Sequence, residues 1–157
     1  MTVVVVVGSI KGSGGVTATS LAVAAAAAET SGVVLVEADP SGGSLLGWCP
    51  TLNPTAGGLY EAVFDRDRDA DAGFEAVLQP LGDIGVVVAQ GDPWRITVAL
   101  QRPRGWRQIV DGVADVVVVD VGRLFPGSPA LALAGVADQL VLVDRLNRGR
   151  WRRRWSG

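Results

Sequence analysis

Residues 8–20, GSIKGSGGVTATS, combine glycines with serines and threonines, between a run of five valines and an alanine-rich segment. Glycine lets backbone N–H groups turn inward and approach an anion closely. A helix that begins directly after such a loop adds the positive end of its dipole. Thr17 would then lie in the first helical turn, where its hydroxyl can bind Mg²⁺. The loop is a candidate phosphate cradle, and the alternative is a tight turn between a strand and a helix.

Two carboxylates stand where a site for a magnesium nucleotide would need them. Asp39 follows the hydrophobic segment VVLVEA, and Asp120 ends the segment VVVVD. The carboxyl ends of parallel strands meet at one edge of a sheet, beside a phosphate loop. There Asp39 could position or activate a water molecule, and Asp120 could hold a Mg²⁺-bound water. The alternatives are that Asp39 caps a turn before Pro40 and that Asp120 only ends a strand.

The hydrophobic pattern predicts the elements that would position these residues. Apolar, β-branched runs predict buried strands at 2–7, 33–38, 84–90, 115–121 and 139–145. Helices are predicted at 17–29, 59–65, 74–81, 93–101, 106–113 and 128–135, with irregular chain at 45–58. This alternation predicts an α/β fold, a mostly parallel β-sheet flanked by helices. Residues 1–144 would form one domain and 145–157 a basic tail.

The composition excludes several kinds of chemistry. The chain of 157 residues is 48% hydrophobic, which suits a single globular domain. It has no histidine and one cysteine, Cys49, which excludes imidazole catalysis and an internal disulfide and argues against a zinc site. The sequence contains no run of about 18 apolar residues, which a membrane-spanning helix would need. We therefore expect a cytoplasmic protein.

Four motifs, in order along the chain, resemble those of one protein family. K-G-S-G-G-V-T, residues 11–17, aligns without a gap with the loop K-G-G-x-G-K-[ST] of the ParA/MinD group of P-loop ATPases. These partitioning and positioning proteins are called deviant because of the extra lysine at the start of the loop. EADPSGG (37–43), VVVVD (116–120) and GVADQLVLVDR (135–145) resemble the segment after the family's second strand, its Walker B strand and its next strand. The resemblance covers most of residues 2–145.

This resemblance implies ATP and Mg²⁺ as cofactors and a dimer, with itself or with a homologue, formed around the nucleotide. Nucleotide would be bound by Lys11, Gly12, Ser13, Gly14, Gly15, Val16, Thr17 and Ala18. Lys11 and Asp39 would be catalytic, because Lys11 would reach the partner's phosphates and Asp39 would be the hydrolytic carboxylate, preceded by Glu37. The metal would be supported by Thr17, Asp39 and Asp120. The implied function is an ATP-dependent switch in partitioning or positioning of DNA or a cellular complex, with a protein cargo or activator that no residue identifies.

The sequence departs from this family at a residue that contacts phosphate. Val16 stands where the general P-loop lysine would lie, and losing one charge-assisted contact weakens binding by on the order of 1.5–3 kcal/mol. Ser13 replaces a glycine of the family loop. After Asp120 the family usually has a proline, whereas this sequence has Gly122 and Arg123. Family members also generally continue beyond this length. We therefore expect an ATPase weakened by Val16, with weak or no hydrolysis. The alternatives are a pseudo-ATPase that partners a complete homologue and a small-molecule enzyme of the same superfamily.

The end of the chain differs in charge from the rest. Residues 145–157 carry six arginines and no acid, which leaves a net charge of −8 on residues 1–144. Within RLNRGRWRRRW, residues 145–155, arginine can pair with phosphates, and tryptophan can stack on bases or lie at a membrane interface. The tail could bind nucleoid DNA or a membrane surface, or be only a solubilising end. The remaining tryptophans are predicted to be packing residues: Trp48, Trp94 and Trp106.

Overall fold

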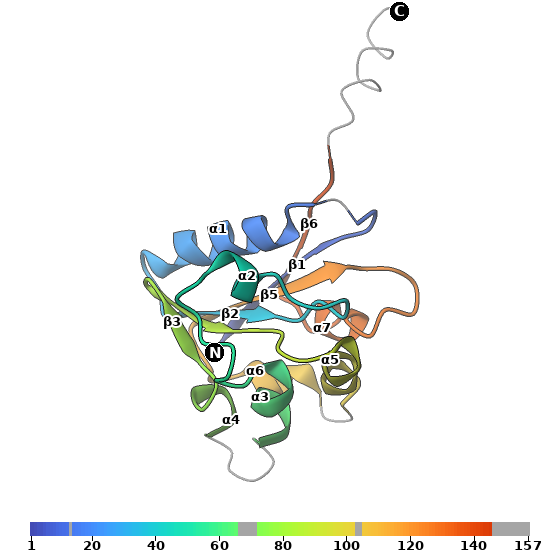
Figure 1. Cartoon of the computed structure of the whole chain (residues 1–157). Helices are drawn as coiled ribbons and strands as arrows, with labels where there is room; N and C mark the ends of the chain where they lie inside the picture. Colours follow the sequence, from blue (N-terminus) through green and yellow to red (C-terminus); the bar gives the residue numbers. More distant parts are fainter. Residues whose placement is uncertain (13, 66–71, 103–104, 146–157) are drawn as a thin grey trace, which may run out of the picture.

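A six-stranded sheet forms the centre of the computed structural model, which describes residues 1–12, 14–65, 72–102 and 105–145 (Figure 1). The strand order is β3-β4-β2-β5-β1-β6. The strands are β1 (Val3–Ser9), β2 (Val33–Glu37), β3 (Gln79–Leu81), β4 (Ile84–Val87), β5 (Val116–Arg123) and β6 (Gln139–Leu142). All neighbours pair in parallel except β3 and β4, which pair antiparallel. The predicted mostly parallel sheet is confirmed.

Helices cover both faces of this sheet (Figure 1). One face carries α1 (Val16–Ala28) and α2 (Leu45–Trp48). The other carries α3 (Leu59–Asp65), α4 (Ala72–Glu75), α5 (Pro93–Leu100), α6 (Trp106–Val110) and α7 (Leu131–Ala134). The longest of these, α1, has 13 residues, and no helix in the described ranges has both the length and the apolarity to span a membrane.

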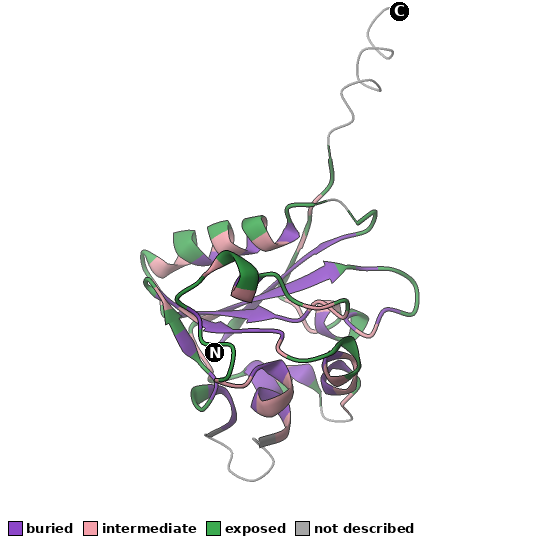
Figure 2. Cartoon of the chain, in the orientation of Figure 1, coloured by how far each residue is buried: buried purple, intermediate pink, exposed green. Residues whose placement is uncertain are grey.

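Valine-rich strands build the core because each strand buries side chains on both faces of the sheet. In β1, Val4 and Val6 pack toward α3, α5 and α6, whereas Val5 and Val7 pack toward α1. β5 is buried from Val117 to Gly122, and Figure 2 shows the central strands as the most buried layer. These rigid strands fix the positions of the loops at their carboxyl ends.

Two predicted segments differ from the structure. The predicted helix at 74–81 is wrong beyond Glu75, because residues 79–81 form the antiparallel edge strand β3. Pro80 is tolerated there because an edge strand leaves one side of its backbone unpaired. The predicted irregular segment 45–58 contains the short helix α2, anchored by the fully buried side chain of Leu45.

Candidate nucleotide site

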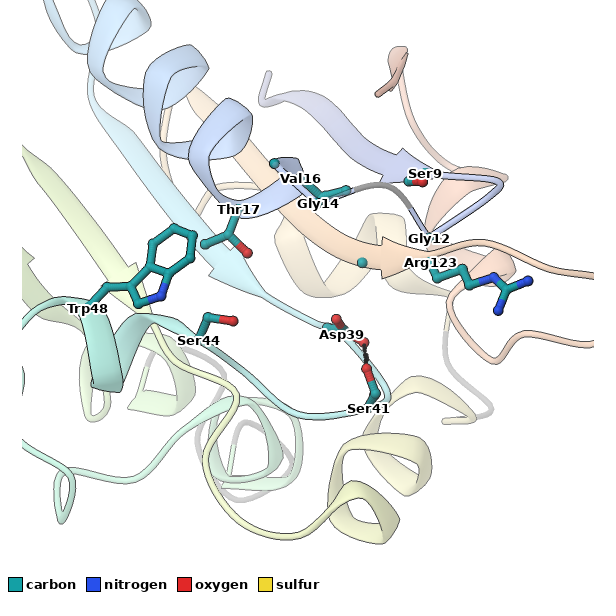
Figure 3. Close-up of a pocket in the computed structure, with 12 residues that line it drawn as sticks. Ser9, Gly12, Gly14, Val16, Thr17, Asp39, Ser41, Ser44, Trp48 and Arg123 are labelled. Atoms are coloured by element: carbon teal, nitrogen blue, oxygen red, sulfur yellow. Dashed lines mark hydrogen bonds between the residues drawn. The ribbon is translucent and has the colours of Figure 1, made fainter. Parts of the chain in front are cut away.

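A cavity of about 360 Å³ lies at the carboxyl ends of β1, β2 and β5 (Figure 3). Ligands bind in this position in open α/β sheets, because loops from neighbouring strands converge there. The lining comes from the loop before α1, the loop after β2 and the end of β5. It comprises Ser9, Gly12, Gly14, Gly15, Val16, Thr17, Asp39, Ser41, Ser44, Trp48, Gly122 and Arg123.

The loop before α1 has the backbone of an anion cradle. Gly12 has φ +67° and Gly15 has φ +107°, a region that side chains other than glycine rarely adopt. Gly15 is the N-cap of α1, so the positive end of this helix opens onto the cavity. Thr17 lies in the first turn of α1, and its hydroxyl points into the cavity in Figure 3. The predicted Gly12, Gly14, Gly15 and Thr17 therefore lie together, and Ser13 lies outside the described residues.

Val16 contributes no charge to this cradle. Its side chain is 6% exposed and belongs to the core between α1 and the sheet, with Val5 and Val7. Its backbone borders the cavity because it begins α1. The first helical turn therefore presents an apolar residue where the family motif has a lysine.

Asp39 lies in the middle of the cavity (Figure 3). Its Oδ1 accepts hydrogen bonds from Ser41 N at 2.9 Å and from Ser41 Oγ at 2.6 Å. The carboxylate rests on Gly122, where a Cβ would lie 2.2 Å from Asp39 Oδ2. Gly122 also has φ +59°, which proline cannot adopt. In this chain, both the backbone conformation and the contact with Asp39 therefore favour glycine at residue 122.

Asp120 is a buried carboxylate with one unused oxygen. It is 1% exposed, and its Oδ1 accepts a hydrogen bond from Gly122 N at 3.0 Å. Its Oδ2 makes no hydrogen bond of ordinary geometry with the described residues, although the Thr17 hydroxyl lies close enough to stabilise the charge. Burial raises the pKa of Asp120, and the negative charge of Asp39 raises it further, whereas the Thr17 hydroxyl and the Gly122 N–H oppose this shift. A buried carboxylate oxygen without a partner beside a threonine hydroxyl fits a divalent cation.

Glu37, the first acid of the predicted motif, has a structural task. Its Oε1 accepts hydrogen bonds from Ser44 N at 2.5 Å and Leu45 N at 2.9 Å, and its Oε2 accepts one from Ala89 N at 3.0 Å. Burial raises the pKa of Glu37, and these three backbone N–H groups oppose the shift. The side chain thus ties the loop after β2 to the end of β4 and sets the position of Asp39.

Three predicted site residues are not among the described residues that line the cavity: Lys11, Ala18 and the buried Asp120. The Lys11 side chain is 73% exposed, and its Nζ lies 3.9 Å from Asp144 Oδ2. Ala18 is exposed on α1. Lys11 is therefore exposed at the surface, in an ion pair with Asp144.

Six lining residues were not among the predicted site residues: Ser9, Ser41, Ser44, Trp48, Gly122 and Arg123. Trp48 is 54% exposed and borders the cavity, so the prediction that it packs in the core is wrong. Trp94 is also exposed, whereas Trp106 is 3% exposed and confirms the prediction. Arg123 lies at the other end of the cavity from Trp48 (Figure 3). The only signal in the sequence for Arg123 is an arginine three residues after Asp120, which ends the Walker B-like segment 116–120.

The described residues contain no group of three or more histidine, cysteine, aspartate or glutamate side chains that could hold a metal ion. Asp120, Asp39 and Thr17 alone are too few oxygen ligands for a dedicated all-protein cage. Mg²⁺ is usually bound by one or two carboxylates, waters and substrate phosphates. The ligand set therefore fits a metal that arrives with phosphate.

Comparison with known proteins identifies the fold. No family model matches the sequence, and no curated protein has significant sequence similarity to it. MinD from Pyrococcus horikoshii in complex with Mg-ADP superposes with a TM-score of 0.67 and 19% identity, over 91% of this chain and 58% of that chain. The fold is that of the ParA/MinD-type P-loop NTPases. A Cyanothece McdA variant in complex with ATP superposes with a TM-score of 0.64 and 18% identity, over 90% of this chain and 55% of that chain. The kinase domain of the Escherichia coli tyrosine kinase ETK superposes with a TM-score of 0.70 and 21% identity, over 92% of this chain and 56% of that chain.

The chain thus spans little more than half the length of these three structures. At identities near 20% they define the scaffold, and the activities in their names differ from one another. Which activity this P-loop NTPase fold carries here must be argued from the site itself.

Proposed function

We propose that this chain binds Mg-ATP at the cavity beside Thr17 and Asp120 and acts as an ATP-dependent dimerising switch, with weak or no hydrolysis. The observation that carries the proposal is the unpartnered Asp120 Oδ2, buried next to a glycine-rich loop and the N-terminus of a 13-residue helix. A buried polar atom without a partner is costly, and a cation would supply the missing interaction. The MinD and McdA structures, which hold Mg-ADP and ATP, support this assignment.

The glycine-rich loop, the Thr17–Asp120 pair and Asp39 have distinct roles in this proposal. Backbone N–H groups of the loop from Gly12 to Gly15 contact phosphate oxygens. Thr17 and Asp120 support the metal, either directly or through water, and Asp39 orients a water molecule near the terminal phosphate. Mg²⁺, when bound, neutralises phosphate charge.

Val16 is the reason for weak or no hydrolysis. Charge that develops on the phosphate in the transition state must be stabilised by donors already in place. An apolar side chain packed in the core supplies none. The same observation favours the second candidate function, a pseudo-ATPase that partners a complete homologue through this fold.

Dimerisation rests on Lys11. Its exposed ammonium group is held only by a 3.9 Å contact with Asp144, which is itself 61% exposed. Such a surface pair contributes little, about 0–1 kcal/mol, so a partner's phosphates could replace it. The proposed surface for DNA or membrane, residues 145–155, lies outside the described residues except for Arg145, and it stays a prediction together with the protein cargo.

A thermal-shift titration with Mg-ATP, Mg-ADP and no nucleotide tests the proposal. Nucleotide at 100 times its Kd should add about 2.7 kcal/mol to the free energy of unfolding. For a domain of this size we expect the melting temperature to rise by about 5–10 °C. Thr17→Val, which removes only the hydroxyl, should reduce the rise, and Lys11→Ala should abolish ATP-dependent dimerisation in size-exclusion chromatography. No shift at millimolar nucleotide would refute nucleotide binding and favour the pseudo-ATPase.

A further inference from the structure

The cavity contains one cationic side chain among its described lining residues, and it comes from β5 rather than from α1. Arg123 is the last residue of β5, three positions after Asp120. The position in α1 that would hold a lysine is occupied by the buried Val16. The positive charge at this site therefore has a different origin from that in the family loop.

The backbone around Gly122 places Arg123 at the loop. The pairing of β1 with β5 is in register through Val7 and Asp120, and then shifts so that Ser9 pairs with Arg123. Gly122, with φ +59°, accommodates this shift, and Leu124 N donates a hydrogen bond to Ser9 O at 2.8 Å. A proline at 122 could not adopt this conformation. Gly122 therefore allows β5 to place the Arg123 side chain next to the glycine-rich loop.

The stem of Arg123 packs against the glycine-rich loop. A Cβ added to Gly12 would lie 3.3 Å from Arg123 Cδ and 3.7 Å from Arg123 Nε. In Figure 3 the side chain starts beside Gly12, and its guanidinium points away from Thr17 and Asp39. A few rotations about the exposed side-chain bonds would turn this group toward a ligand on the loop. Arginine binds phosphate through two parallel N–H donors, which suits a terminal phosphate.

The charge of Arg123 is uncommitted. Within the described part of the chain, its guanidinium has no hydrogen bond or ion pair. Other basic side chains do have acidic partners: Lys11 with Asp144, Arg95 with Glu61 and Arg107 with Asp138. An unpaired guanidinium at the rim of a cavity can bind an anion without first breaking a contact.

We propose that Arg123 is the phosphate-binding cation of this site and takes over the role of the lysine that Val16 replaces. The inference rests on the proposed nucleotide binding and adds to it the residue that recognises the polyphosphate. Arg145 is the main competitor, because its Nη2 lies 3.2 Å from the position of a Cβ on Gly14. Lys11 is the second, although it lies outside the lining and contacts Asp144.

Isothermal titration calorimetry on the full chain, with Mg-ATP and with magnesium tripolyphosphate, tests this inference. Arg123→Gln removes the charge and keeps most of the stem, and Arg145→Gln is a matched single-charge control. We expect Arg123→Gln to weaken both ligands about 10- to 100-fold, since a hydrogen bond to a charged group contributes on the order of 1.5–3 kcal/mol. Arg145→Gln should weaken ligand binding by less than about threefold, because Arg145 does not line the cavity.

The outcomes separate this inference from the proposed function. If the wild type binds neither ligand, the proposed function fails. If the wild type binds and Arg123→Gln binds equally well, or if only Arg145→Gln loses affinity, Arg123 is not the phosphate ligand although nucleotide binding stands. A loss with Mg-ATP alone would place Arg123 on the base or ribose and also overturn the inference. Should Arg123→Gln not fold, Arg123→Met decides: it also removes the charge and keeps an apolar stem against Gly12, so affinity equal to the wild type would count against phosphate recognition by Arg123.

Discussion

Asp120→Asn should make the protein without ligand more stable at neutral pH, although Asp120 belongs to the site. The wild-type carboxylate is 1% exposed, and one of its oxygens has no partner among the described residues. An asparagine keeps an acceptor for Gly122 N and removes the buried charge. Leaving a buried polar group unsatisfied costs on the order of 1–3 kcal/mol, more for a charged one. We therefore expect Asp120→Asn to raise the melting temperature by about 3–9 °C.

The pH dependence of stability provides a second, independent test of this prediction. Burial raises the pKa of Asp120 from its ordinary value of 3.8, so the folded protein holds this proton more tightly than the unfolded chain. The free energy of unfolding of the wild type then falls as the pH rises from about 4 through the raised pKa. The advantage of Asp120→Asn should be full above that pKa and should disappear as the pH approaches 4. Thermal denaturation from pH 4 to pH 8 without ligand measures both effects.

Glu37→Gln is the matched control, because Glu37 is equally buried but fully bonded. Its two oxygens accept three backbone N–H groups, and an amide would turn an NH₂ toward at least one of them. This substitution should lower the melting temperature by about 3–9 °C. Two results would contradict the prediction: Asp120→Asn destabilises the protein at pH 7.5, or its effect at pH 4 equals that at pH 7.5. Either result would mean that the buried Asp120 carboxylate does not lower the stability of the protein without ligand. The role of Asp120 as a metal ligand would then lose its main support.

Two further predictions concern the ends of the cavity. Gly122→Ala should destabilise the protein by about 1–2 kcal/mol or more, since φ +59° is strained for alanine and its Cβ would lie 2.2 Å from Asp39 Oδ2. Urea unfolding measures this loss of stability. An unchanged unfolding midpoint would contradict the position of Asp39. Trp48 borders the cavity and is 54% exposed, so Mg-ATP should change the intrinsic fluorescence of the wild type, and Trp48→Phe should remove most of that change. If the full change persists in Trp48→Phe, the ligand does not reach α2.

The parallel sheet could be predicted from the sequence because its strands are buried on both faces. Such strands appear as continuous apolar runs, as in β1, β2 and β5, and these runs also predicted the positions of Asp39 and Asp120. β3 was missed because three residues at a sheet edge, including Pro80, carry no hydrophobic period. α2 was missed because its four residues are held by the tertiary contacts of Leu45 and Glu37 rather than by helix propensity.

The site was predicted less completely than the fold, for a reason that Trp48 and Arg123 illustrate. Their places in the cavity depend on the path of a loop and on a register shift at the end of a strand, neither of which leaves a periodic signal. Aromatic residues are more often buried than exposed, and that general tendency gave the wrong environment for Trp48. Residues fixed by motif spacing, such as Thr17, were placed correctly beside the cavity because the loop directly precedes α1.

The departures from the family motif at residues 16, 122 and 123 depend on one another. Restoring the family residue at only one of these positions should therefore not restore nucleotide affinity. Val16 is packed between α1 and the sheet, where a lysine would need to leave the core or lose charge. Gly122 allows both the contact with Asp39 and the register shift that brings Arg123 to Gly12. We therefore expect Val16→Lys to destabilise the protein and to restore little affinity while Arg123 is present. In the background of Arg123→Gln, the same lysine should recover part of the lost binding of Mg-ATP, and strict additivity of the two substitutions would show that the two positions act independently.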